Sequence, residues 1–330
     1  MPLDHSTLKA LRGVSGSTDI DLSKLKHRVS DDSAPTVFFT RDISPQGVMA
    51  TYEALGRVPT GKVACKLSTG EAGNPNHLDP KLIQDLVQKL DGTIVECNTA
   101  YAGTRFHTDE HLRLAAAHGF AAIAPVDIMD AKGELELKVT GGQHLSSDLV
   151  GSHIQNYDFM MVLSHFKGHP RGGLGGALKN ISIGVASAEG KSLTHTAGAT
   201  DKFEDWPPAF RDIKSPEHLI FLECMAEAAQ AVIDYFGAGK RMLYLSVLNN
   251  LSVDCDCVST PAPIEMRDIG IAASLDPVAL DQACVDLVYQ APDGAPVVER
   301  IESRRGTHIL DHAQQLGLGH KNYQLVDLDR

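Results

Sequence analysis

Short apolar segments alternate with helical segments from Thr36 onward, and this alternation constrains the fold more than any other feature of the chain. Four short, apolar segments bounded by turn residues predict strands: Thr36–Phe39, Val63–Lys66, Thr93–Glu96 and Ala121–Ala124. The segments between them have the apolar spacing of helices: Pro45–Leu55, Pro80–Leu90 and Thr108–His118. Strands that alternate with helices predict an α/β fold, in which helices cover both faces of a mostly parallel sheet.

The rest of the chain continues this pattern. Further strands are predicted at Glu134–Val139, Phe159–Ser164, Arg241–Leu248, Ile269–Ala272 and Tyr323–Val326. Further helices are predicted within Leu178–Val185 and at Pro216–Phe236, Asp276–Val288 and Val298–Leu316. Residues 1–34 are polar and weakly patterned, so we expect an N-terminal extension with one short helix, followed by an α/β domain over residues 35–330. If the domain has two lobes, the second begins near residue 130.

Charge and cysteine content restrict the classes of function. The net charge of −12 argues against wide, nonspecific nucleic-acid binding, which needs lysines and arginines to neutralise phosphates. The longest apolar stretches are too short to cross a bilayer, and the first residues lack the basic and apolar regions of a targeting segment. The six cysteines form neither a dense disulfide framework nor a paired CxxC zinc pattern. We therefore expect a reduced, cytoplasmic protein without membrane or nucleic-acid partners.

Residues 164–195 carry the densest chemistry. His165 and His169 follow a predicted buried strand, Lys179 comes ten residues after His169, and His195 ends the segment. Between His169 and Lys179 lies a glycine-rich loop with Gly172, Gly173, Gly175 and Gly176. Glycine lets backbone N–H groups approach a ligand closely, and a following helix N-terminus favours anions. Such a concentration of titratable groups indicates a functional site. The alternative is a tight turn flanked by surface histidines.

Cys255-Asp256-Cys257 is the second candidate site. Thiolates two residues apart can bind a soft metal or form redox-active sulfur. Two cysteines are too few for a closed tetrahedral site, so histidines or solvent would complete it. We therefore predict a composite metal site of Cys255, Cys257, His165 and His169. The alternative is a pair of half-buried, small apolar residues.

Two more loops follow predicted strands, at the position where open α/β sheets bind ligands. The first contains Asn74, and the second contains Asn98 and Arg105, whose guanidinium can hold a carboxylate with two N–H groups. The alternatives are a plain turn for the first loop and a surface ion pair for Arg105. His107 and His111 lie one helical turn apart without a visible third ligand, so we expect them at the surface.

These landmarks, in this order, resemble the family called domain of unknown function number 362, whose members are often labelled Fe–S-centre proteins. The resembling stretches are Gly70–Asn76, Asp91–Phe120, Ser164–Lys191, Asn249–Leu287 and His308–Val326. Many members carry a ferredoxin-like insert with two runs of CxxCxxC, which would fall after His195. This chain reads Thr-Asp-Lys-Phe-Glu-Asp-Trp-Pro-Pro there. A 4Fe–4S cluster is therefore not expected, because it needs about four cysteine ligands.

A fainter resemblance is to lactate racemase-like proteins, which hold a nickel-pincer nucleotide through a motif of the form His…Gly-Phe-Ser-Gly-Gly-x-Lys…Asn-His. The positions here that look like this pattern are His169, Gly173, Gly175, Gly176, Lys179 and His195. Leu174 replaces the phenylalanine, Thr194 precedes the second histidine, and the racemase-type signature of the N-terminal part is not evident. The resemblance implies that Lys179 attaches or contacts the cofactor and that His169 and His195 are ligands or acid–base groups.

Together these features predict a metal- or cofactor-dependent enzyme that moves a proton or hydride on a small anionic metabolite, as an isomerase or an oxidoreductase does. His169 and His195 are the candidate acid and base, because histidine exchanges protons near neutral pH. Lys179 is the candidate cofactor or anion anchor, and Arg105 the candidate carboxylate clamp. The alternatives are a non-catalytic metal-binding or electron-transfer protein, and a ligand-binding protein that has lost its chemistry. The substrate, the metal and the oligomeric state stay open.

Overall fold

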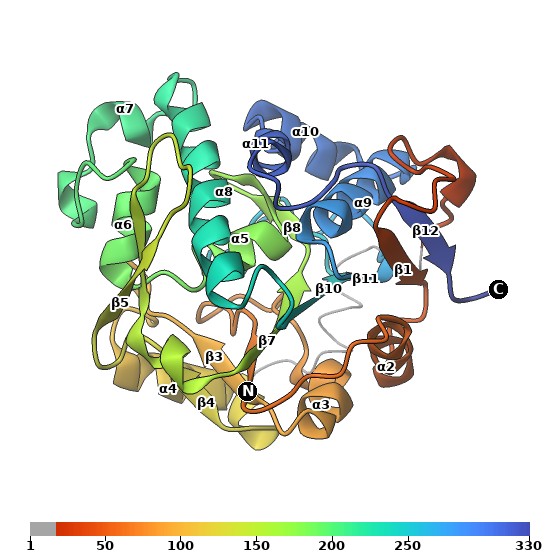
Figure 1. Ribbon diagram of the computed structural model, residues 1–330, viewed down its shortest axis with the longest axis horizontal. Coiled ribbons are helices and arrows are strands. Elements are labelled where there is room, and N and C mark those ends of the chain that lie inside the picture. The colour runs from red at the N-terminus through yellow and green to blue at the C-terminus, as the bar shows by residue number, and fades with distance from the viewer. Residues whose placement is uncertain (1–17) are drawn as a thin grey trace.

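The computed structural model describes residues 18–330, and its central element is an eight-stranded sheet with the order β12-β1-β11-β10-β7-β2-β3-β4 (Figure 1). The strands are β1 (Thr36–Thr40), β2 (Val63–Lys66), β3 (Thr93–Glu96), β4 (Val126–Ile128), β7 (Phe159–His165), β10 (Met242–Leu248), β11 (Gly270–Ser274) and β12 (Gln324–Asp327). Strand β11 runs antiparallel to both of its neighbours, and every other neighbouring pair is parallel. The predicted mostly parallel sheet is confirmed.

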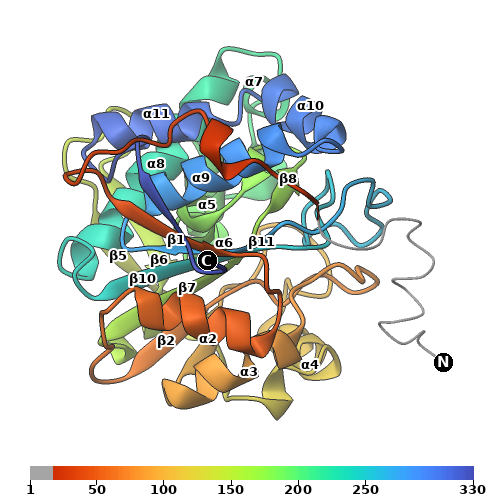
Figure 2. The ribbon, with the colours of Figure 1, turned by 90° about the vertical axis from the view of Figure 1, so that its right-hand side faces the viewer.

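Helices cover both faces of the sheet (Figure 2). One face is covered by α2 (Pro45–Ala54), α3 (Pro80–Lys89) and α4 (Thr108–Ala117). The other face is covered by α5 (Ala177–Ile181), α8 (Glu217–Tyr235) and α9 (Pro277–Gln290), with α6 (Ala188–His195), α7 (Pro208–Arg211), α10 (Ala295–Ser303) and α11 (His308–Gln315) packed beyond them. Strand β7 shows why its sequence is apolar throughout: Met160 and Val162 enter the core on one face, and Met161 and Leu163 enter the core on the other.

The predicted strand at Ala121–Ala124 is wrong, because the chain forms the 3₁₀ helix η2 (Phe120–Ala122) and then strand β4. Gly119, with φ of 92°, reverses the chain after α4, and Phe120 is buried directly after it. Pro125 has no N–H to donate, but its carbonyl accepts a hydrogen bond from the N–H of Ile94 at 2.9 Å. The strand therefore pairs only from Val126 onward.

The predicted helix Val298–Leu316 is divided into α10 and α11. The turn between them contains Arg305, with φ of 53°, and Gly306, whose N–H returns to the carbonyl of Ile301 at 2.8 Å. A side chain on Gly306 would lie within 2.8 Å of the Gly172 carbonyl oxygen, so this turn packs directly against the glycine-rich segment. Because Gly306 and the facing Gly172 lack side chains, this turn can pack against the glycine-rich segment and support it.

Two small antiparallel sheets accompany the large one. Strand β5 (Glu134–Lys138), predicted as an outer strand, pairs with β6 (Ser147–Gly151) outside the main sheet. Strands β8 (Lys167–His169) and β9 (Gly173–Gly175) form a short hairpin out of the predicted glycine-rich loop. In the sequence, this hairpin follows directly after the end of β7.

The predicted N-terminal extension lies partly outside the described residues. From residue 18 onward it contains the 3₁₀ helix η1 (Leu22–Lys24), and Ile20, Leu22 and Leu25 are buried in the core. The large sheet contains strands from both sides of residue 130. Within residues 18–330, no helix has the length and apolar character needed to cross a membrane.

Candidate functional site

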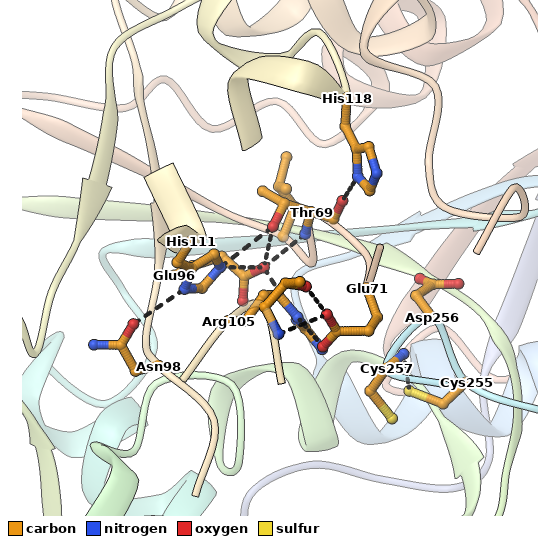
Figure 3. Close-up of polar contacts among 12 residues, drawn as sticks. Thr69, Glu71, Glu96, Asn98, Arg105, His111, His118, Cys255, Asp256 and Cys257 are labelled. Carbon is orange, nitrogen blue, oxygen red and sulfur yellow. Dashed lines mark hydrogen bonds and ion pairs between the residues drawn. The ribbon is translucent and has the colours of Figure 1, made fainter. Parts of the chain in front are cut away.

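A cavity of about 330 Å³ lies at the carboxyl edge of the sheet. The parallel strands β2, β3, β7 and β10 all end at this edge, and the segments that follow them line the cavity. The β8–β9 hairpin and the loop 249–269 therefore meet the loops after β2 and β3, although these segments are far apart in the sequence. Figure 3 shows how side chains from several of these segments approach one another.

The two cysteines of the loop 249–269 face the cavity together with His169. One ligand atom from each of Cys255, Cys257 and His169 can be chosen so that all three lie within 4.8 Å of one another. The distance from Cys257 Sγ to His169 Nε2 is 3.9 Å, and the N–H of Cys257 donates to Cys255 Sγ at 3.3 Å. Among residues 18–330 this is the only group of three such side chains close enough to hold a metal ion.

Asn74 holds the cysteine loop in place. Its side-chain amide donates to the carbonyls of Cys255 at 3.2 Å and Val258 at 2.8 Å. The backbone N–H of Glu71 also donates to the carbonyl of Asp256 at 2.7 Å. The predicted ligand-binding loop after β2 thus shapes the cysteine loop, and Asn74 acts through it.

Asp256 lies in a turn that the N–H of Val258 closes on the carbonyl of Cys255 at 3.0 Å, and its side chain meets Lys167 and His165 instead of the sulfurs. Its carboxylate lies 2.5 Å from Lys167 Nζ and 3.0 Å from His165 Nδ1, and the carboxylate is buried. Burial alone would raise the pKa of Asp256, but His165 and Lys167 hold this pKa well below its usual range. The other ring nitrogen of His165 donates to the carbonyl of Asn249 at 2.6 Å. Both ring nitrogens of His165 therefore bond to protein groups other than Cys255, Cys257 and His169, the three potential metal ligands.

His169 and His195 both line the cavity, and their hydrogen bonds assign them opposite tautomers. His169 Nδ1 accepts from the backbone N–H groups of Gly172 at 2.8 Å and Arg171 at 3.2 Å, so the proton of the neutral ring is on Nε2. His195 Nδ1 donates to the carbonyl of Lys191 at 2.7 Å, so its Nε2 has a free lone pair. One ring can donate a proton at Nε2, and the other can accept one.

Burial keeps both rings neutral. Burial, assisted by the nearby Lys179 ammonium, lowers the pKa of His169 to about 4. Burial and the Arg171 guanidinium lower the pKa of His195 well below its usual range. The His195 ring is stacked between Trp206 and Phe221, with centroid distances of 4.7 and 4.4 Å. These two aromatic side chains fix the ring plane.

Arg105, the predicted carboxylate clamp, already has carboxylate partners. Its guanidinium lies 3.3 Å from Glu71 and 3.6 Å from Glu96, as Figure 3 shows. Lys66 Nζ lies 3.7 Å from Glu96, and burial lowers the pKa of Lys66 to about 8 although Glu96 acts in the opposite direction. These four buried groups form an ionic network in and behind the cavity wall.

The side chain of Asn98 forms its hydrogen bonds with residues of its own segment, not with groups across the cavity. Its amide donates to Thr108 Oγ1 at 3.0 Å, and its oxygen contacts His111 Nδ1 at 3.3 Å. The predicted surface position of His111 is wrong: the ring is fully buried, because Asn98, Thr69 and Glu96 surround its nitrogens. His107 is exposed, as predicted.

The four glycines of the predicted loop divide into two pairs. Gly175 and Gly176 line the cavity. Gly172 donates to His169, and Gly173 has φ of 76° and would clash with Gly306 if it carried a side chain. Lys179, on α5, lines the same cavity.

Several cavity residues escaped the sequence argument: Lys66, Lys167, Arg171, Lys191, Phe203 and Trp206. One signal was available, since Lys66 is a charged residue at the end of an apolar strand. Another was that Trp206 is the single tryptophan of the chain.

A family model described as Domain of unknown function (DUF362) matches residues 63–286, which is more than half of the chain. The structure of the lactate racemase apoprotein from Thermoanaerobacterium thermosaccharolyticum is similar with a TM-score of 0.41 and 13% identity, over 77% of this chain and 57% of that chain. A crystal structure of a protein from Thermotoga maritima gives a TM-score of 0.43 and 13% identity, over 73% of this chain and 57% of that chain.

The chain thus spans less than two thirds of either solved structure. No curated protein matches the sequence. The family match confirms the first resemblance found in the sequence, and neither structural likeness assigns an activity to this chain.

Proposed function

The chain belongs to the DUF362 family, whose name assigns no activity, and we propose from its site that it is a metal-dependent enzyme that moves a proton or hydride on a small anionic metabolite. The observation that carries the proposal is the composition of one cavity. Two sulfurs, two neutral histidines with opposite tautomers and a lysine that has no acidic partner among residues 18–330 line it together. A packing role alone explains none of these groups.

The donor set fits a soft metal ion, because thiolate and imidazole ligands favour nickel, zinc or copper. Cys255 and Cys257 would be the ligands, with solvent or substrate completing the coordination. His169 presents an N–H rather than a lone pair toward the sulfurs, so its role beside a bound metal is to donate a hydrogen bond unless it loses that proton. A metal held there would supply Lewis-acid polarisation of a substrate oxygen.

The two histidines suit proton transfer at a carbon next to a carboxylate. His195 Nε2 accepts the proton, because its lone pair is free and burial disfavours its charged form in the resting protein. His169 Nε2–H donates a hydrogen bond to the substrate oxygen on which negative charge develops, and the Lys179 ammonium stabilises the same charge. The proton taken by His195 returns to the carbon from the same ring. A nickel-pincer-type nucleotide, which the sequence resemblance implies, would find its anchor in the same lysine.

A second candidate function is electron transfer without substrate turnover. Its support is the cysteine pair, in which Cys257 lowers the pKa of Cys255 and Cys255 raises the pKa of Cys257. A pair of this kind is typical of redox-active sulfur.

The experiment begins with elemental analysis of protein purified without oxygen. We expect stoichiometric metal in the wild type and in a Cys224→Ser control, and its loss in the double variant Cys255→Ser, Cys257→Ser with an unchanged circular dichroism spectrum. Cys224 is a matched control because it is buried in the core, away from the cavity. Equal metal in the double variant would contradict the proposed ligands.

Turnover is then tested with pools of small carboxylates and phosphates in D₂O. Deuterium incorporation at a carbon next to the acid group, detected by NMR, supports proton movement when His195→Gln abolishes it. Metal with reversible reduction and no incorporation supports the electron-transfer alternative instead.

A further inference from the structure

The cavity wall holds more positive charge than its carboxylates balance. Six cationic side chains line the cavity: Lys66, Lys167, Lys179, Lys191, Arg105 and Arg171. Three of these have acidic partners within ion-pair distance, because Lys66 and Arg105 contact Glu96 and Glu71, and Lys167 contacts Asp256. The other three cations decide the net charge that a ligand meets.

These three cations have no acidic partner within ion-pair distance in the part of the chain that the structure describes. Lys191 Nζ donates to the carbonyl of Ala186 at 2.5 Å. The Arg171 guanidinium donates to the carbonyls of Phe210 and Arg211 and lies 5.5 Å from the Trp206 ring centroid. Neutral carbonyls satisfy hydrogen bonds but do not cancel charge.

Lys179 differs from the other two, because its ammonium forms no hydrogen bond or ion pair with residues 18–330. Its charge nevertheless reaches the centre of the site, since it helps to lower the pKa of both His169 and His195. All three cations line one cavity, so a ligand bound there meets an excess of positive charge. Partly buried charges without partners are costly unless a ligand supplies the opposite charge.

We infer that the cavity binds a small organic dianion, either a phosphate monoester or a dicarboxylate, at Lys179, Lys191 and Arg171. The inference rests on the proposed function in that it names the substrate class of the same site. A monoanion would leave two of the three cations without a counter-charge, whereas a dianion leaves only one. Charge-assisted hydrogen bonds to lysine and arginine are the chemistry that recognises both classes of anion.

Aromatic side chains favour an organic ligand over an inorganic one. Tyr101, Phe203 and Trp206 line the same cavity as the cations. Phe203 lies 4.9 Å from Trp206 and 6.1 Å from Tyr101 between ring centroids, so the three form a continuous apolar surface. A ligand with a planar or apolar portion can contact this surface while its charged groups meet the cations.

The single tryptophan of the chain, Trp206, provides the readout through its fluorescence. The probes are phenyl phosphate and phthalate as aromatic dianions, benzoate as an aromatic monoanion, and inorganic phosphate. We expect one of the two aromatic dianions to bind about tenfold or more tighter than benzoate and than inorganic phosphate. Tighter binding of phenyl phosphate identifies the phosphate class, and tighter binding of phthalate identifies the dicarboxylate class.

Substitutions of the cationic residues test which side chains bind the dianion. Lys179→Ala and Lys191→Ala should each weaken binding of the preferred dianion about tenfold, because each removes one charge-assisted contact. Lys179→Arg should restore most of the affinity. Lys81→Ala is the matched control, since Lys81 is exposed on α3 and its substitution removes the same charge from the protein. Circular dichroism verifies that each variant is folded.

Benzoate binding as tight as both dianions, or equal losses in Lys81→Ala and Lys179→Ala, would overturn the inference. The titrations use protein of measured metal content, which separates the two proposals. Absence of dianion preference in metal-containing protein overturns this inference alone. Dianion preference in protein that binds no metal supports it and overturns only the metal-dependent function.

Discussion

The carboxylate of Asp256 lies 2.5 Å from the ammonium of Lys167, and both side chains are buried beneath the cysteine pair. Because Asp256 is placed between Cys255 and Cys257, this ion pair connects the cysteine loop to β8, the strand that ends at His169. The relative position of the sulfurs and the imidazole therefore depends on a buried ion pair in the cavity wall.

Removing that contact should be costly. Asp256→Asn leaves the buried Lys167 without its counter-charge, and breaking a buried pair in this way costs about 3–5 kcal/mol of unfolding free energy. Asp254→Asn, which loses the more accessible pair with Arg300, should cost about 1 kcal/mol or less. Urea denaturation measures the unfolding free energy of both variants. Equal losses would contradict the expectation that the buried pair stabilises the protein more than the accessible one.

The cysteines should differ in reactivity. The hydrogen bond from Cys257 lowers the pKa of Cys255, whereas burial raises the pKa of Cys65 to about 12 and raises those of Cys97, Cys224 and Cys284 further above the usual range. Iodoacetamide at neutral pH should therefore label the cysteine pair before the other four. Peptide mass spectrometry locates the label, and comparable labelling of Cys97 would contradict the expectation.

Adjacent glycines should tolerate a side chain differently. A Cβ on Gly176 would lie 2.3 Å from Asp281 Oδ1, the atom that accepts from the N–H of Ala177 at the start of α5. A Cβ on Gly175 would meet Lys167 Cε at an ordinary 3.6 Å. Gly176→Ala should therefore destabilise the protein by about 1–3 kcal/mol, as overpacking does, and Gly175→Ala by much less. Thermal unfolding of the two variants checks the order.

Asp148 should make stability depend on pH. It is buried without a hydrogen-bond partner among the described residues, and burial raises its pKa from 3.8 to about 7. The folded protein thus keeps a proton that the unfolded chain loses, so this contribution to stability is present at low pH and is lost as pH rises toward 7.

Replacing this carboxyl should remove that dependence. From about pH 5.5 to about pH 8, Asp148→Asn should gain about 2 kcal/mol relative to the wild type, because about 1.5 pH units separate pH 5.5 from the folded pKa of about 7. Asp85→Asn, which changes an exposed carboxylate, should follow the wild type. Parallel stability curves for all three proteins would rule out the contribution of Asp148.

The histidines should affect rate rather than binding. Once deuterium exchange into a substrate is detected, His169→Ala or His195→Ala should reduce its rate about 10²–10⁴-fold, the usual contribution of a positioned acid or base. Affinity for the dianion, followed through Trp206 fluorescence, should stay close to that of the wild type. A variant that loses affinity and rate equally would identify its histidine as a binding group.

The strands β1, β2 and β3 were predictable because each is a short apolar run between turn residues. The same signal misled at Ala121–Ala124, where a short apolar run packs equally well as one helical turn, and tertiary contacts decide. The division of α10 from α11 was missed because its turn contains one glycine and a left-handed Arg305, which no helical period reveals.

The site residues likewise divide into those that the sequence predicted and those that it did not. His169, Lys179 and the cysteine pair were found because their motifs are contiguous in sequence. Lys66 and Lys191 were missed, because single lysines become site residues only when distant segments meet at one sheet edge. The tautomers of the histidines were equally hidden, since backbone groups of the folded chain assign them.

The reversed direction of β11 has a consequence for how such a site can change. An antiparallel step needs no crossover helix, so the chain leaves β10 and enters β11 at the same edge of the sheet. The segment 249–269 is therefore an excursion whose two ends are fixed by neighbouring strands. Between these ends the loop is held by Arg300 of α10 and Lys167 of β8, so the positions of Asp254 and Asp256 are the ones a changed loop must keep. Under the proposed function, we expect that changing the donor atoms of this loop changes which metal ion the cavity prefers, while the order of the sheet is kept.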